Sequence, residues 1–326
     1  MLFAAAVKRA AELLRSSEVV ALPTETVYGL AANALDEKAV AKIFQIKGRP
    51  AHNPIIIHVS SNEMAADCVA HWPEAALKFS HAFWPGPLTL VLPRAKKIPD
   101  AVTAGGETVG VRWPSHPFMQ AVIRECGFPL AAPSANLSNQ ISPTNAMHVH
   151  AQLGGKISLI VNGGQSQVGI ESTVVDLTAN PPRVLRPGMI HVESLAAVSE
   201  GIQNPEPGTR NPETALRSPG MLAKHYSPKA KLVVLKWNDD ADLRLQVSDF
   251  KFPISTCHVI AHTKIPAGFA PENVSVIPHD AEAFARALYG ELHRCDAAGA
   301  KLIVVEAPPE TAAWSGIADR LRRAAA

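Results

Sequence analysis

The chain has 326 residues, 47% of them hydrophobic, and a formal net charge of +2. This length predicts about two domains, each with enough apolar residues for a core of its own. The small net charge argues against a protein whose main task is to coat nucleic acid, although it is compatible with a local basic cleft. The 4 cysteines are scattered and form no CxxC or Cys/His cluster. We therefore expect no zinc site and no disulfide framework, and a cytoplasmic location.

The first two hundred residues alternate apolar strands with helices. An amphipathic helix over 7–14 opens the chain without a preceding basic segment, which favours a helix over a secretory leader. No apolar run reaches the roughly 20 residues that a membrane-spanning helix needs. Strands are predicted at 19–23, 55–59, 88–92, 108–112, 130–132, 159–161, 172–176 and 183–186, and helices at 37–46, 63–69, 73–82 and 117–125. The pattern predicts a strand-rich α/β domain over 1–203.

The rest of the chain divides into a linker and a smaller domain. Residues 204–228 are rich in Pro, Gly, Thr and Arg and show no sustained period, as in a linker. Such a segment is either a passive spacer or, with His225 and Tyr226 in it, a flap that closes over a site. Strands at 232–235, 258–261, 274–277 and 302–305 alternate with helices at 241–247, 281–296 and 316–323. Residues 229–326 are therefore predicted to form a small open α/β sheet, and no Gly-rich loop there indicates a cofactor.

The segment 44–58 is the most informative part of the sequence. Lys47 and Arg49 flank a glycine, and Asn53 and His58 follow around two prolines. A shaped turn that presents two fixed cations suits a polyanion such as a nucleotide phosphate tail. The alternative is a solvated loop, and His58 could equally be a satisfied core residue of its strand.

Other polar segments carry the same ambiguity. Ser134 and Asn136 follow an apolar strand in a tight turn, and Ser172 precedes another strand. Each can bind a ligand or merely cap or pair with its neighbours. The segment Thr24-Glu25-Thr26 could likewise have a ligand-binding or a structural role. P-loop, GxGxxG, HExxH and GxSxG motifs are absent from the sequence, so side chains would have to hold any phosphates. The candidates for this are Lys47, Arg49, Arg112 and Arg186.

Taken in order, these segments resemble the threonylcarbamoyl-AMP synthase family in its long, two-domain form. They are PTETVYGL at 23–30, KGR at 47–49 with Asn53 and His58, SAN at 134–136, ESTVVD at 171–176, LRPG at 185–188, and SPGM at 218–221 with His225 and Tyr226. The resemblance implies a twisted mixed-sheet YrdC-like domain with a basic cleft, followed by a smaller open, Rossmann-like α/β domain.

The resemblance also implies an activity. ATP, L-threonine and bicarbonate would give threonylcarbamoyl-AMP and pyrophosphate. A downstream threonylcarbamoyl transferase machinery would then modify an adenosine of tRNA. Mg²⁺ would be held mainly by the ATP phosphates, without a dedicated set of protein ligands.

Matching positions give each residue a role. Lys47 and Arg49 would be catalytic, through stabilisation of phosphate charge. ATP would be held by Arg49, Asn53, Thr108, Ser134, Asn136, Ser142, Arg186 and Tyr226. L-Threonine would be held by Thr26, His58, Arg112, Ala132 (through its backbone) and Ser172.

Two other functions stay open on the sequence. A basic sheet could bind structured RNA without catalysis, or bind double-stranded RNA weakly beside catalysis; the modest charge and the lack of aromatic stacking motifs argue against the former. A carbamoyl transferase of hydrogenase maturation would share the YrdC-like part. It would also need zinc-finger and acylphosphatase-like regions, which this sequence lacks.

Overall fold

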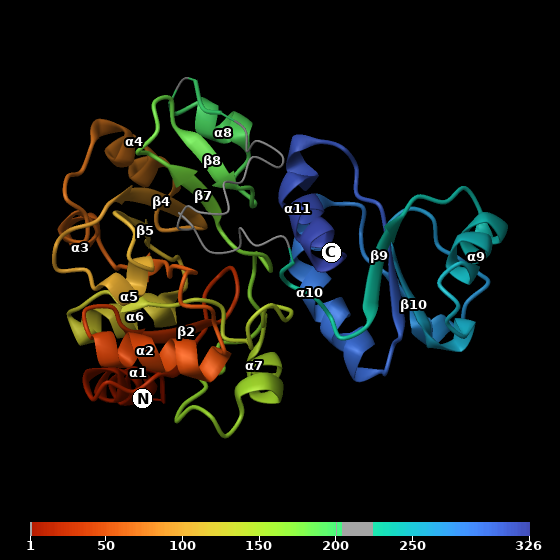
Figure 1. Ribbon diagram of the computed structural model, residues 1–326, viewed down its shortest axis with the longest axis horizontal. Helices are drawn as coiled ribbons and strands as arrows, with labels where there is room; N and C mark the ends of the chain where they lie inside the picture. The colour runs from red at the N-terminus through yellow and green to blue at the C-terminus, as the bar shows by residue number, and fades with distance from the viewer. Residues whose placement is uncertain (1, 200, 204–223) are drawn as a thin grey trace. The chain divides into compact units, whose positions relative to one another are not determined.

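The computed structural model describes residues 2–199, 201–203 and 224–326, which fall into two compact units. The first unit is Met1–Ser138 with Ser142–Met221, and the second is Asn139–Ile141 with Leu222–Ala326. Figure 1 colours the first from red to green, and residues 224–326 of the second in cyan and blue. Residues 204–223 of the predicted linker lie outside the described residues, so its closure over a site stays a prediction. The predicted boundaries at 203 and 229 likewise stay predictions.

The first unit is built on a mixed sheet of eight strands. They are β1 (Val20–Leu22), β2 (Gly29–Asn33), β3 (Ile57–His58), β4 (Leu88–Pro93), β5 (Thr108–Arg112), β6 (Leu130–Ala131), β7 (Thr173–Asp176) and β8 (Arg183–Arg186). Their order across the sheet is β1-β2-β6-β3-β5-β4-β7-β8. β3 pairs with β5 and β4 with β7 in parallel, whereas the remaining neighbours pair antiparallel.

Helices surround this sheet, and the sequence sets their ends. They are α1 (Leu2–Arg15), α2 (Glu37–Lys47), α3 (Asn62–Asp67), α4 (Glu74–Phe83), α5 (Asp100–Thr103), α6 (Pro117–Cys126), α7 (Ala146–Leu153) and α8 (Val192–Ala196). At the start of α2 the Asp36 side chain accepts hydrogen bonds from two backbone N–H groups of the first turn. Gly48 ends that helix with φ 59°, a left-handed conformation that glycine adopts readily. The cap thus fixes where Lys47 and Arg49 leave the helix.

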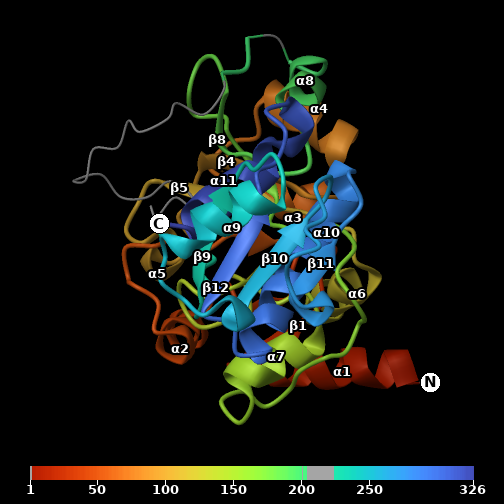
Figure 2. The same cartoon turned by 90° about the vertical axis from the view of Figure 1, so that its right-hand side faces the viewer.

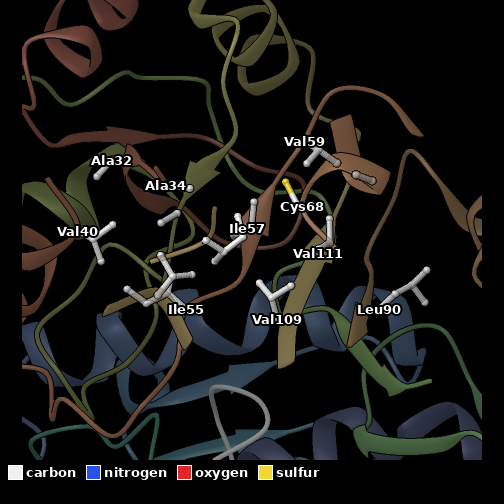
Figure 3. Packing of buried hydrophobic residues seen from close by; sticks show 14 of the residues in the cluster. Ala32, Ala34, Val40, Ile55, Ile57, Val59, Cys68, Leu90, Val109 and Val111 are labelled. Carbon is white, nitrogen blue, oxygen red and sulfur yellow. The ribbon is translucent and has the colours of Figure 1, made fainter. Parts of the chain in front are cut away.

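Apolar side chains pack on both faces of the sheet. On one face α1 and α6 cover Val20, Leu22 and Ala31, and on the other face alternate residues such as Ala21 and Leu30 join the larger core. Figure 3 shows part of the larger core, where Ile57, Val111 and Leu90 project from neighbouring strands. Burial on both faces explains why these strands read as nearly continuous apolar runs.

The second unit has a parallel sheet in the order β11-β10-β12-β9 (Figure 2). Its strands are β9 (Lys231–Leu235), β10 (Cys257–Ala261), β11 (Val274–Val276) and β12 (Leu302–Glu306). Its helices are α9 (Asp240–Ser248), α10 (Ala281–Ala297) and α11 (Ser315–Ala324), with single 3₁₀ turns at Ile254–Thr256, Pro271–Asn273 and Ala312–Trp314. Figure 1 shows α9 on one side of this sheet and α10 and α11 on the other. The predicted open α/β domain is confirmed.

The mixed α/β character of the first unit is also confirmed, with differences in detail. The segment 159–161 forms only a single bridge, between Ile160 and Ala21. The strand predicted at 55–59 is shorter, because the N–H of Ile55 donates to the carbonyl of Val102 instead of to a strand neighbour. β2 and α7 were not predicted, since their alanine-rich and histidine-containing sequences give no clear period. None of the helices in the described part of the chain combines the length and apolar character needed to cross a membrane.

Ile57 provides a test of the larger core. It is fully buried between Val111 and Ala131, so Ile57→Ala should lower the free energy of unfolding by about 2–5 kcal/mol. Urea unfolding followed by circular dichroism measures the loss. Leu77→Ala on α4, at an exposed position, is the control and should stay within about 0.5 kcal/mol of wild type. Equal losses in the two variants would contradict this account of the core.

Candidate active site

Strand register brings four predicted site residues to one edge of the eight-stranded sheet. His58 ends β3 opposite Arg112, which ends the parallel strand β5. β4 runs antiparallel to β5 and so begins at this edge, as does its parallel neighbour β7, directly after Ser172. β8 returns antiparallel to β7 and ends there with Arg186. The sheet therefore gathers residues that are far apart in the sequence.

Three other predicted residues lie toward the opposite ends of these strands. Asn53 precedes β3, Thr108 begins β5, and Ser134 follows β6, which runs antiparallel to β3. At the usual rise per residue, the α carbons of Thr108 and Arg112 are about 13 Å apart. Among these residues, Asn53, Thr108 and Ser134, predicted for ATP, thus lie toward one end of the strands. His58, Arg112 and Ser172, predicted for threonine, lie toward the other, and the exceptions are Arg186 and Ala132, which directly follows β6.

Arg112 is held by three oxygen atoms from two segments of the chain. Its Nε donates to the carbonyl of Gly86 over 3.2 Å, and its Nη1 donates to Oγ1 of Thr26 over 2.9 Å. Its Nη2 lies 2.7 Å from Oε1 of Glu25. The Thr24 hydroxyl stabilises the turn that carries Glu25 and Thr26, by donating to the carbonyl of Val27 over 2.6 Å. Thr26 is therefore joined to the strand-end cluster through Arg112.

His58 is buried and electrically neutral. Burial lowers its pKa to about 3, and the nearby Arg112 guanidinium acts in the same direction, while the carbonyl of Ile56 opposes both. Its Nδ1 is shielded from solvent and has no hydrogen-bond partner within the described part of the chain. Leaving a buried polar atom unpaired costs about 1–3 kcal/mol, so this nitrogen is suited to a ligand group that supplies the missing partner.

Lys47 braces the turn that carries Ser134 and Asn136. Its ammonium donates to the carbonyls of both residues, each over 2.5 Å, and contacts Oδ1 of Asn136 at 3.2 Å. The carbonyl of Lys47 accepts from the N–H of Ser138 over 2.9 Å. Burial lowers the pKa of Lys47 well below its usual range, and Arg49 lowers it further. These contacts occupy the three ammonium donors, so the turn depends directly on Lys47.

Arg49 and Asn53 form the next turn of the same segment. Nε of Arg49 donates to the carbonyl of Asn53 over 3.0 Å, and its Nη2 donates to that of Pro54 over 2.7 Å. The Asn53 side chain is fully buried, and among the residues that the structure describes neither its Oδ1 nor its Nδ2 has a hydrogen-bond partner. An amide whose donor and acceptor meet nothing in the described part of the chain indicates a position for a ligand.

Ser172, which directly precedes β7, is hydrogen-bonded to Arg186, the last residue of β8. Arg186 donates from Nε to the carbonyl of Ser172 and from Nη2 to its hydroxyl, each over 3.1 Å. The same hydroxyl lies 2.8 Å from that of Thr89. Next to it, the Ser142 hydroxyl donates to the Glu171 carboxylate over 2.6 Å. Predicted threonine and ATP residues are therefore in direct contact here.

The two remaining predicted residues have different surroundings. Ala132 is buried after β6, and its N–H donates to the carbonyl of Ile56 over 3.2 Å. Tyr226 belongs to the second unit, where its ring stacks on Tyr289 at 5.9 Å and the Arg320 guanidinium lies 5.4 Å from the ring centre. Its φ of 62° is unusual for a tyrosine. Its contact with ATP stays a prediction.

Sequence reasoning did not assign three polar residues that the structure places at this site. Glu25 pairs with Arg112, Thr89 contacts Ser172, and Glu171 accepts from Ser142. Glu25 and Glu171 lie inside motifs that were noticed, and their position next to Thr26 and Ser172 was the available signal. Thr89 lies in an apolar strand and gave none.

The fold and the site define a class, the two-domain YrdC-like proteins. The chain has a mixed eight-stranded sheet, a polar site built from side chains without a P-loop, and a second unit with a parallel sheet. Residues 12–188 match the family model described as Telomere recombination, which takes in the YrdC proteins. Residues 190–326 match the model described as Threonylcarbamoyl-AMP synthase, C-terminal domain.

Full-length relatives specify the family. The chain is 40% identical to the threonylcarbamoyl-AMP synthase of Pyrococcus abyssi, over 98% of this chain and 93% of the relative. It is 39% identical to that of Bacillus subtilis, over 98% and 92%. The crystal structure of P. abyssi Sua5 complexed with L-threonine superposes with a TM-score of 0.90 at 38% identity, over 98% of this chain and 94% of the other. The chain belongs to the threonylcarbamoyl-AMP synthase family, in its two-domain form.

The neutral state of His58 predicts a specific loss of stability in acid. The unfolded chain takes up a proton on this histidine below about pH 6.5, but the folded chain does so only near pH 3. The contribution of His58 to the free energy of unfolding is therefore fully present above pH 6.5 and is lost as the pH drops toward 3. Between pH 6.5 and 4.5 His58 should account for about 2–3 kcal/mol of this loss.

His58→Gln should remove that share, because glutamine does not titrate. The unfolding free energy measured in urea at pH 6.5 and 4.5 gives the difference for each variant. His71→Gln, at an exposed position, is the control and should keep the wild-type pH dependence. An unchanged pH dependence in His58→Gln would show that this histidine is not buried in the neutral form.

Proposed function

We propose that this chain forms threonylcarbamoyl-AMP and pyrophosphate from ATP, L-threonine and bicarbonate, for the threonylcarbamoyladenosine modification of tRNA. The observation that carries the proposal is that the site contains both buried cations and buried polar atoms without hydrogen-bond partners. Asn53 and His58 offer hydrogen-bonding atoms that nothing in the described chain satisfies, within a site that also holds Arg49 and Arg112. Membership of the family indicates which substrates would bind to these atoms.

The reaction has two balanced steps. The uncharged amine of threonine attacks the carbon of bicarbonate, and loss of hydroxide, which leaves as water with a proton from the amine, gives the carbamate. A carbamate oxygen then attacks the α-phosphorus of ATP, and the bond from that phosphorus to the pyrophosphate oxygen breaks. Both steps need reactants held in line in a site that stabilises phosphate charge, without a covalent intermediate on the protein.

The residues divide between the two substrates. In this proposal Thr26, Arg112 and Ser172 hold the polar groups of threonine, and the neutral His58 exchanges a hydrogen bond with it. Ala132 contributes through its backbone. ATP lies against Arg49 and Asn53, and the further ATP contacts come from Thr108, Ser134, Asn136, Ser142, Arg186 and Tyr226. Lys47 supports catalysis through the turn that it braces.

Mg²⁺ in this proposal accompanies the ATP phosphates. The part of the chain that the structure describes has no group of three or more His, Cys, Asp or Glu side chains arranged for a metal. Magnesium usually keeps several waters and is bound mainly through substrate phosphates and one or two carboxylates. When bound, the ion would offset phosphate charge.

The product is proposed to pass to a separate threonylcarbamoyl transferase that acts on tRNA. We expect the reaction to take place in the cytoplasm. Direct contact with double-stranded RNA would be weak at most, since the net charge is only +2.

A pyrophosphate-release assay tests the activity. The purified chain with ATP, L-threonine and bicarbonate should release pyrophosphate, and omission of any one of the three should reduce release to background. A non-enzymatic RNA-binding module would release none. Release that persists without threonine would point to a different ATP-dependent reaction.

Lys47 and Arg49 should be essential for this reaction. Lys47→Ala removes the brace under the 134–136 turn, and Arg49→Ala removes a buried cation next to Asn53. Each should lower kcat/KM for pyrophosphate release at least about tenfold, equivalent to ~1.4 kcal/mol. Lys42→Ala, on the same helix but pairing with Glu18 at the surface, is the control and should retain wild-type rates. Wild-type rates in both test variants would refute the assigned roles.

A further inference from the structure

Glu25 is a buried carboxylate that the threonine and ATP contacts leave without a role. It lies in the turn between β1 and β2, and both its oxygens are shielded from solvent. The turn is fixed, because the carbonyls of Glu25 and Thr26 accept from the N–H groups of Val168 and Gly169 over 2.7 and 3.1 Å. A charged side chain in such a rigid, dry position costs free energy unless it has a specific partner.

That partner is Arg112. Oε1 of Glu25 lies 2.7 Å from Nη2 of Arg112, and both side chains are more than nine-tenths buried. The distance makes an ion pair, yet among the described residues neither Glu25 oxygen nor Nη2 of Arg112 has a hydrogen-bond partner. Glu25 thus neutralises the guanidinium without taking up the N–H bonds of Nη2. The other fixed contacts of the guanidinium are through Nε and Nη1.

This arrangement differs from a merely structural ion pair. A buried pair that only supports the fold has the remaining lone pairs and N–H bonds satisfied, because unpaired ones are costly. Here the charge is balanced while donors on the cation stay uncommitted. An oxyanion is the chemical group that such a guanidinium edge is suited to bind.

We propose that Glu25 is a positioning residue, which holds the Arg112 guanidinium in the orientation that receives the carboxylate of the amino-acid substrate. The inference rests on the proposed function, since it takes that substrate to be L-threonine. Glu25 acts through Arg112. Without the Glu25 charge, Arg112 would be an unpaired buried cation and would leave this orientation.

The field of Glu25 reaches one further titratable group. Burial lowers the pKa of His116 at the start of α6, and the Glu25 charge opposes that shift. The pKa of His58, by contrast, is lowered by burial and by the Arg112 guanidinium. Glu25→Gln should therefore lower the pKa of His116 further, which histidine NMR can follow.

Steady-state kinetics of pyrophosphate release by the full chain test the proposal. Glu25→Gln should raise KM for L-threonine at least about tenfold and leave KM for ATP within about twofold. Glu25→Asp, which keeps the charge on a shorter side chain, should recover part of the loss. Glu74→Gln is the matched control, because Glu74 forms an exposed ion pair with Lys78 at 2.8 Å, and it should behave as wild type.

A double variant separates positioning from general damage to the fold. If Glu25 works through Arg112, then Glu25→Gln should add less than about a twofold change in threonine KM once Arg112 is methionine. The double variant should also unfold at a higher temperature than Arg112→Met or Glu25→Gln alone, since it leaves no unpaired buried charge.

The outcomes are distinct. An unchanged threonine KM in Glu25→Gln, equal effects on threonine and ATP, or a full Glu25 effect in the Arg112→Met background would each overturn the proposal. A wild-type chain that releases no threonine-dependent pyrophosphate would instead refute the proposed function. In that case the melting temperatures and the His116 titration would still test the Glu25–Arg112 pair.

Discussion

The constraint on which the site depends is the burial of positive charge. Lys47, Arg49, Arg112 and Arg186 are 3%, 8%, 4% and 3% exposed. A buried cation is tolerated only when nearby oxygens replace its hydration. Here those oxygens are mainly backbone carbonyls in the segments that precede or follow strands. The fold must therefore bring distant turns together before the cations can be accommodated.

This requirement links the fold to the chemistry. The cations are fixed before a substrate arrives, so they lose little conformational freedom when it binds, which favours precise positioning of reacting groups. Asn53 and His58 add a second feature, because they hold buried polar atoms without a hydrogen-bond partner among the described residues, and a ligand could supply the missing partners. A site of this kind can stabilise phosphate charge and orient a small amino acid without a Gly-rich phosphate loop.

Several parts of the fold could be predicted from local sequence. The helix ending at Gly48 and the strands β5, β9 and β12 follow from capping residues and apolar runs. Two features could not be predicted: the strand β2, and the reduction of the segment 159–161 to a single bridge. In both cases the strand pairing depends on neighbours that are distant in the sequence. Among the site residues, Lys47 and Arg49 stood out as clustered charges. Thr89 could not be recognised, because it lies in an apolar strand. Its place in the site follows from the pairing of that strand with β7, which brings it to Ser172.

By itself, the sequence determined the family, through motifs that recur in a fixed order, and with it the candidate substrates and most candidate residues. Only the tertiary structure decided how those residues relate. It showed that Lys47 supports the 134–136 turn, that His58 is neutral, and that Glu25 is paired with Arg112. The physical reason is that hydrogen bonding, burial and charge pairing depend on distances between atoms, and strand register across the sheet sets those distances.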